Sequence, residues 1–202
     1  MTKPAPRVLR SRSVRIALLG AAAFGVSGCL PEKVDTQVFP TLSECTAAAQ
    51  DGTAKFSEQD CQEAFSLAVV AHNETAPRYD EQALCEEQHG GECVADPAAV
   101  SSSGGGSVFM PLMMGYMMGS MMNNGRPAMS AQPLYRTASG SFATPSGATN
   151  LNSNRGAINL APSNFKAASA TSAALPMTRA TVRSTGGFGA GRTGGGSRSF
   201  GG

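Results

Sequence analysis

The spacing of apolar positions in the first half of the chain is helical, and no segment shows sustained strand alternation. Cys61, Phe65, Ala68 and His72 recur three or four residues apart. On a helix this spacing places all four side chains on one face, which would turn toward a core. The pattern therefore predicts a helix over residues 58–74.

Residues suited to helix ends support the predicted helices. Ser57 is placed to cap the helix over 58–74, Asp60 to complete a capping box, and Pro77 to stop it. A shorter helix is predicted over 81–89, with Gly90 supplying its left-handed exit.

The elements assemble into a predicted order along the chain. A third helix over 43–50 completes an acidic, α-helical head at residues 35–97. A Gly/Ser linker at 98–107 leads to a short, methionine-rich hydrophobic helix at 108–122. Residues 123–202, rich in Ala, Ser, Thr, Gly, Asn and Pro, are predicted to be a basic, low-complexity, disordered tail. The predicted fold class is a small all-α head with a short hydrophobic helix and a long disordered tail.

The beginning of the chain has the three parts of a secretory signal peptide, predicted to cover residues 1–28. A basic region is followed by an apolar run at 16–26, which is too short to span a hydrocarbon core of ~30 Å. Val26-Ser27-Gly28-Cys29 then resembles the lipobox of bacterial lipoproteins, in which the cysteine thiol takes a diacylglycerol and becomes the first residue. Cys29 is therefore the predicted lipidation site, with residues 29–34 as a tether.

Lipidation of Cys29 sets the expected location. Several acyl chains on one residue give stable membrane anchoring. By analogy with Gram-negative sorting rules, Leu30 rather than Asp after this cysteine points to the outer membrane. We expect a cell-envelope protein, anchored by lipid and facing the periplasm, with no cofactor besides that covalent lipid.

Charge is unevenly distributed along the chain. Residues 30–100 hold all fourteen acidic residues and a net charge of −11, whereas residues 101–202 carry eight cations and no acid. This asymmetry suggests an interaction tail or contact between the two halves. Anionic lipid head groups, cell-wall polymers or the acidic head are the expected contacts of the basic tail. An exported chain would rarely meet nucleic acid, which is therefore not a predicted partner.

Four cysteines remain once Cys29 is lipidated: Cys45, Cys61, Cys85 and Cys93. An even set in an exported protein predicts disulfides, and four cysteines permit three pairings. The two halves of the head share one sequence pattern: a predicted helix start, a cysteine, a glycine that interrupts the helix, and a second cysteine preceded by an acidic residue. This weak internal repeat favours the pairing Cys45–Cys61 and Cys85–Cys93, although sequence alone does not choose among the three pairings.

Metal binding and catalysis are both disfavoured in the head. Cys85, His89 and Cys93, with His72, make a conceivable zinc site, but the tight cysteine spacing of structural zinc sites is missing and an oxidising compartment favours disulfides. His89 is more simply a cation in the last turn of a helix. Two histidines and no convincing nucleophile leave no triad to assemble, so we expect no enzyme activity.

Seven methionines fall within thirteen residues: Met110, Met113, Met114, Met117, Met118, Met121 and Met122. A helix here would pack on the head, or dock on the membrane or on another envelope protein. Thioethers also select Cu(I), and Met113, Met117 and Met121 are the candidate ligands. These three interpretations stay open at the level of sequence.

Several segments together resemble the YgiB-like family of uncharacterised proteobacterial envelope proteins. They are Cys45 and Cys61 preceded by acids, Ala76-Pro77-Arg78-Tyr79, the run from Cys85 to Cys93, Phe109-Met110-Pro111-Leu112-Met113 continuing to Gly115-Tyr116-Met117-Met118-Gly119, and the Gly/Ser/Arg-rich end. The resemblance implies location and architecture but brings no catalytic residues. The leading prediction is a non-enzymatic structural or accessory lipoprotein that acts by contacts. The alternative is a periplasmic Cu(I)-binding protein.

Overall fold

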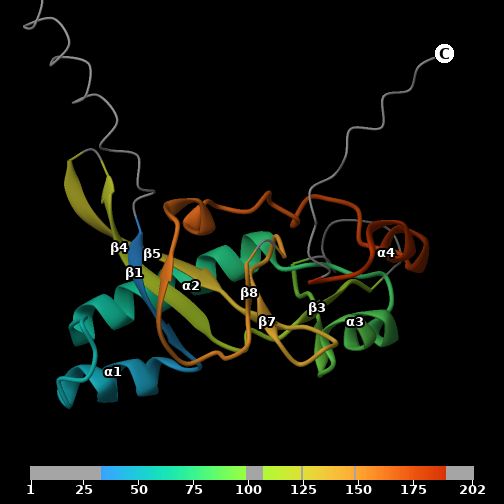
Figure 1. The fold of residues 1–202 in the computed structure, drawn as a ribbon. Coiled ribbons are helices and arrows are strands. Elements are labelled where there is room, and N and C mark those ends of the chain that lie inside the picture. The colour runs from blue at the N-terminus through green and yellow to red at the C-terminus, as the bar shows by residue number, and fades with distance from the viewer. Residues whose placement is uncertain (1–32, 99–106, 124, 148, 190–202) are drawn as a thin grey trace, which may run out of the picture. The chain divides into compact units, whose positions relative to one another are not determined.

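The computed structural model describes residues 33–98, 107–123, 125–147 and 149–189, and these form a mixed α/β fold (Figure 1). Among the described residues, one strand precedes the first three helices and eight strands follow them, and strands form both ends of the region predicted to be all-α. The predicted fold class is therefore wrong. The signal peptide and Cys29 lie outside the described residues.

The three predicted helices of the head are present. They are α1 (Leu42–Gln50), α2 (Glu58–Thr75) and α3 (Gln82–His89). The capping box of α2 forms as expected, because the Asp60 backbone N–H donates to Ser57 Oγ and the Ser57 backbone N–H donates to Asp60 Oδ2. Gly90 ends α3 with a φ of 57°, the left-handed conformation that glycine adopts readily.

A four-stranded antiparallel sheet occupies the centre of the described fold, with strand order β5-β4-β1-β9. Its strands are β1 (Val34–Phe39), β4 (Tyr116–Asn123), β5 (Arg126–Pro133) and β9 (Gly156–Leu160). Two smaller sheets accompany it. One pairs β2 (Cys93–Ala95) with β3 (Phe109–Pro111), and the other joins β6 (Tyr135–Arg136), β7 (Phe142–Ala143) and β8 (Asn150–Leu151).

The methionine-rich segment is strand, not helix, because it lies in a sheet that is covered on both faces. Tyr116 and Met118 point to the face covered by α1 and α2, in one buried cluster with Cys45 and Cys61. Met117 points the other way, into a cluster with Val34 and Leu134. A strand buried on both faces has apolar residues in a run rather than in alternation. The adjacent Met117 and Met118 supply one side chain to each face.

Much of the predicted disordered tail is also ordered. Its residues form β5 to β9, the 3-10 helix η2 (Pro162–Phe165) and α4 (Arg179–Thr185). β5 pairs with β4, and β9 pairs with β1 more than a hundred residues away in sequence. β9 is too short to form alone, so its order depends on pairing with the distant β1. The prediction of disorder is wrong for 125–147 and 149–189.

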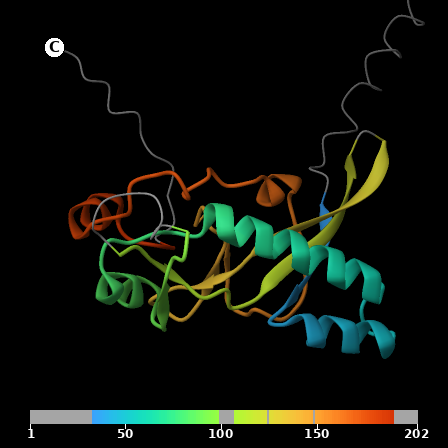
Figure 2. The same ribbon diagram turned by 180° about the vertical axis from the view of Figure 1, so that it is seen from behind.

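Two disulfides link the helices to neighbouring elements, and their pairing is the one that the internal repeat favoured. Cys45–Cys61 joins α1 to α2 with a Cα–Cα distance of 5.8 Å, and Cys85–Cys93 joins α3 to β2 at 6.2 Å. Cys45 Sγ also lies 3.5 Å from Met118 Sδ, so this disulfide is part of the core; Figure 2 shows α2 crossing in front of the sheet. The Cys45–Cys61 disulfide closes a loop with a sequence separation of 16 residues. In the chain-entropy model, a disulfide that closes a loop of this size stabilises a fold by about 3 kcal/mol.

Ion pairs connect the acidic first half to the basic second half. Arg155 Nη2 donates to Glu44 Oε1 at 2.7 Å, which ties the segment before β9 to α1. Arg179 donates to both Glu81 and Glu87 at 3.0 Å, which ties the start of α4 to α3. The contact between halves that the charge asymmetry suggested therefore exists within the described chain. No helix among the described residues is long and apolar enough to cross a membrane.

Candidate binding pocket

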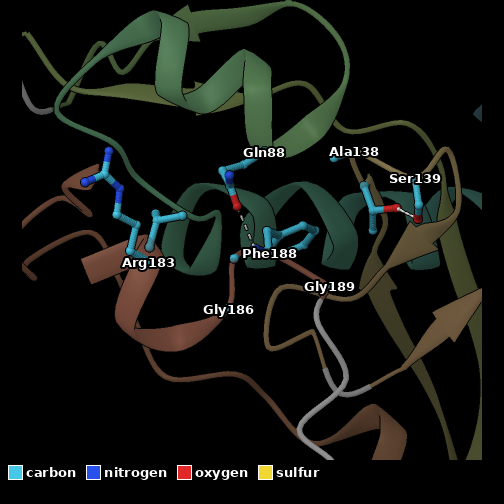
Figure 3. A pocket seen from close by; sticks show the side chains of 10 residues that line it. Gln88, Ala138, Ser139, Arg183, Gly186, Phe188 and Gly189 are labelled. Atoms are coloured by element: carbon cyan, nitrogen blue, oxygen red, sulfur yellow. Dashed lines mark hydrogen bonds between the residues drawn. The ribbon is translucent and has the colours of Figure 1, made fainter. Parts of the chain in front are cut away.

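A shallow pocket of about 510 Å³ opens where three distant segments meet (Figure 3). The end of α3 forms one wall, the turn between β6 and β7 a second, and the end of α4 with the loop after it the third. Its lining residues are Gln88, Thr137, Ala138, Ser139, Val182, Arg183, Gly186, Gly187, Phe188 and Gly189.

The glycine-rich loop after α4 is fixed against α3. Thr178 caps α4 in a reciprocal capping box with Thr181. Beyond the helix, the Phe188 backbone N–H donates to Gln88 Oε1 at 2.9 Å, as the dashed line in Figure 3 shows. Gly187 has a φ of 85°, and a Cβ there would lie 2.5 Å from that same oxygen. Only glycine therefore allows the loop to approach Gln88 this closely.

Hydroxyl groups line the wall opposite α3. Thr137 Oγ1 lies 2.9 Å from Ser139 Oγ and 2.8 Å from Ser141 Oγ, and the two serine hydroxyls are 3.2 Å apart. Each hydroxyl both donates and accepts, so the cluster can rotate its hydrogens to suit a polar ligand. The exposed Arg183 adds a cation. The pocket is therefore equipped for hydrogen bonding and for attraction of an anion.

His89 lies behind the pocket, and its hydrogen bonds define its tautomer. Its ring is 4.4 Å from the Phe188 ring, centroid to centroid, and its residue is 2% exposed. His89 Nδ1 lies 2.8 Å from the Arg136 carbonyl oxygen, which can only accept, so Nδ1 carries the proton. Nε2 then accepts from the Tyr79 hydroxyl at 2.9 Å. Burial lowers the pKa of His89 to about 4, so the prediction of a helix-end cation is wrong.

His72, on α2, lies in an environment similar to that of His89 on α3. Its Nδ1 lies 3.0 Å from the Tyr135 hydroxyl, and burial and the charge of Arg78 lower its pKa, against an opposing effect of Asp96. Burial also raises the pKa of the Tyr135 hydroxyl. Both histidine–tyrosine pairs therefore carry no charge at neutral pH and form a hydrogen-bonded core.

The residues considered for metal binding do not come together. Cys85 and Cys93 are bonded to each other, so neither offers a thiolate. No group of three or more His, Cys, Asp or Glu side chains in the described ranges is arranged to hold a metal ion. Among the copper candidates, Met117 and Met121 pack with the cluster on one face of the sheet, and Met113 packs with the cluster on the other. The sheet separates these thioethers.

We expect the purified protein to lose stability as the pH falls from 6.5 toward about 4. In that range the unfolded chain binds a proton at His89 whereas the folded protein does not, so each pH unit favours unfolding by about 1.4 kcal/mol. Denaturant unfolding at several pH values measures the slope. His89→Gln, which keeps a hydrogen-bonding side chain without titrating, should have a flatter slope. Equal slopes for both proteins would show that His89 titrates normally.

Sequence analysis did not identify the pocket. Gln88, Thr137 and Phe188 are polar or aromatic residues in unremarkable contexts, and they meet only through the fold. The local signals were the Thr178-x-x-Thr181 capping box and the glycines following it, which mark a helix and a sharp exit inside the supposed tail.

The described residues form a disulfide-linked α/β fold, and comparison with known proteins places the chain in a family. The chain belongs to the family described as "Protein of unknown function (DUF1190)", whose model matches residues 33–198. This confirms the resemblance drawn from the sequence motifs. No solved structure matches the chain.

Three relatives are described as UPF0441 proteins. That of Pectobacterium carotovorum is 30% identical over 192 residues, 88% of this chain and 80% of that protein. That of Sodalis glossinidius is 36% identical over 129 residues, 61% of this chain and 56% of that protein. That of Serratia proteamaculans is 32% identical over 149 residues, 67% of this chain and 64% of that protein. The matched region thus spans less than two thirds of the last two relatives.

Proposed function

We propose that this protein is a non-enzymatic lipoprotein of the cell envelope that acts by binding a polar, anionic partner in its pocket. The observation that carries the proposal is the chemistry of the lining: hydroxyls, an amide and a guanidinium, with no base beside the hydroxyls. The histidine behind the lining is neutral, buried and covered by Phe188. Such a set recognises a ligand but does not activate a nucleophile.

The envelope assignment rests on the lipobox-like start and on the disulfides. Cys29 would carry the lipid, and the chain after it would face the periplasm from the outer membrane. Two disulfides suit an oxidising compartment such as this. Candidate partners are therefore other envelope proteins and anionic envelope polymers, and Arg183 is the cation that the pocket offers them.

The copper alternative receives no support from the positions of its ligands. Met117 is fully buried, and Met113 lies across the sheet from it. A Cu(I) site needs several thioethers around one ion. We therefore do not retain copper binding as a second function.

Photo-crosslinking in living cells tests the binding proposal. A photoreactive residue in place of Ser139, an exposed residue that lines the pocket, should give a discrete adduct in the envelope. The matched control places the same residue at the exposed Ser66 on α2, outside the pocket, where no such adduct should form. Adding Arg183→Glu should remove most of the Ser139 adduct. Equal adducts at both positions, or an adduct insensitive to Arg183→Glu, would count against binding in the pocket.

A further inference from the structure

The β4–β5 hairpin continues beyond the strand beside it. β1 pairs with β4 from Phe39↔Tyr116 to Thr36↔Gly119, whereas the pairing of β4 with β5 continues four residues further, to Asn123↔Arg126. Figures 1 and 2 both show this hairpin projecting past the start of β1. The end of the hairpin is therefore supported on neither side by another strand.

The projecting end of the hairpin carries an exposed apolar side chain on one face and a cation on the other. Met122 is 64% exposed, whereas its neighbour Met121 packs against the core cluster that contains Val34. Arg126 and Pro127, across the turn, are also exposed. We call Met122, Arg126 and Pro127 the hairpin tip. Met122 pairs with Pro127, so Arg126, the residue before Pro127, points to the opposite face of the hairpin. A thioether and a guanidinium at the end of one hairpin are suited to a surface that is apolar below and anionic above.

The antiparallel pairing places the hairpin tip at the end of the sheet where the chain enters. Because β1 and β4 run in opposite directions, the start of β1 lies beside the end of β4. Lys33, the exposed residue before β1, is four residues from Cys29. Four residues reach at most about 14 Å when fully extended. Continued by three residues, the register Thr36↔Gly119 brings Lys33 level with Met122, so the hairpin tip lies level with the residue that enters the sheet.

We propose that the hairpin tip docks on the membrane surface that holds the lipid of Cys29. This inference rests on the proposed function, because the lipid on Cys29 is what brings the bilayer close to β1. Because Cys29 is four residues from Lys33, which is level with Met122, an extended tether allows the hairpin tip to reach the head groups around the lipid. Met122 enters the boundary between head groups and acyl chains, and Arg126 binds anionic head groups. The body is thereby held at a fixed orientation instead of swinging on its tether.

Depth-dependent quenching tests this docking in the full, lipidated chain. The protein is reconstituted into vesicles of phosphatidylethanolamine and phosphatidylglycerol, with a fluorophore attached to Met122→Cys. The matched control carries the fluorophore on Leu112→Cys, a 41% exposed residue before β4, at the opposite end of that strand. Spin-labelled lipids should quench the fluorophore at position 122 strongly and that at position 112 little. Arg126→Glu should weaken the quenching at position 122 in anionic vesicles and leave it unchanged in zwitterionic ones.

Flotation of the vesicles distinguishes failure of the docking inference from failure of the lipid-anchor proposal. If the labelled protein floats with the vesicles but positions 122 and 112 are quenched equally, or neither is quenched, the docking inference is overturned and the anchor stands. If the wild-type protein does not float, the lipid anchor itself is refuted, and the docking inference with it.

Discussion

Replacing Arg78 with Met should lower the free energy of unfolding by about 3–5 kcal/mol, the usual cost of breaking a buried ion pair from one side. Arg78 and Asp96 are each 4% exposed, and Arg78 Nε donates to Asp96 Oδ2 at 2.6 Å. Methionine would fill much of the volume but take the guanidinium of Arg78 away from the buried carboxylate.

The guanidinium of Arg78 also joins three segments of the fold. Its Nη2 donates to the Asn73 carbonyl at 2.7 Å, and its Nη1 donates to the Thr171 hydroxyl at 2.7 Å. The first contact holds the end of α2, and the second holds the loop that precedes α4. Loss of Arg78 should therefore loosen that loop as well as destabilise the whole fold.

Denaturant unfolding measures the effect, with two controls. Arg78→Met combined with Asp96→Asn also removes the charge of the buried carboxyl group and should recover a large part of the loss. Lys55→Met breaks the exposed pair with Asp35, whose side chains are 63% and 65% exposed, and should cost at most about 1 kcal/mol. If Arg78→Met were no more destabilising than Lys55→Met, the buried pair would not have the structural role described.

The helices were predictable because their signals are local. Ser57 and Asp60 mark the start of α2, and Gly90 marks the end of α3, independently of contacts with distant parts of the chain. The strands were not predictable, since β4 is covered on both faces and so lacks the alternation that reveals a half-buried strand. β9 has even less local signal, and it exists through pairing with β1.

The pocket escaped prediction for a related reason. Gln88, Thr137 and Phe188 come from segments separated by roughly fifty residues each, and only the fold brings them together. The charge asymmetry did predict a contact between the two halves of the chain, because Arg155 and Arg179 pair with acidic residues of the first half. Charge alone could not show that these contacts belong to one folded body.

The hairpin tip and the pocket lie at opposite ends of the described fold. Figures 1 and 2 place the projecting hairpin at one end, and α3 and α4, which form the pocket walls, at the other. A protein docked on the membrane by its hairpin would therefore present its pocket away from the lipid, toward the periplasm. This arrangement is consistent with a lipoprotein that binds a partner at a fixed distance from its membrane.

Cys29→Ser should abolish lipid attachment completely, since the thiol forms the thioether bond and serine cannot replace it. The unlipidated precursor should also keep its signal segment, because the cleavage in lipoproteins of this kind follows lipidation. The disulfides provide a matched control: Cys85→Ser with Cys93→Ser removes a pair buried in the fold and should leave labelling unchanged. Membrane fractionation should show the Cys29→Ser chain at a larger size than the wild-type protein.

Labelling of growing cells with radioactive palmitate tests the lipoprotein account most directly. We expect the wild-type protein and the Cys85→Ser/Cys93→Ser variant to incorporate the label, and the Cys29→Ser variant to incorporate none. A Cys29→Ser protein that is still labelled and processed normally, or a wild-type protein that takes up no label, would contradict the account.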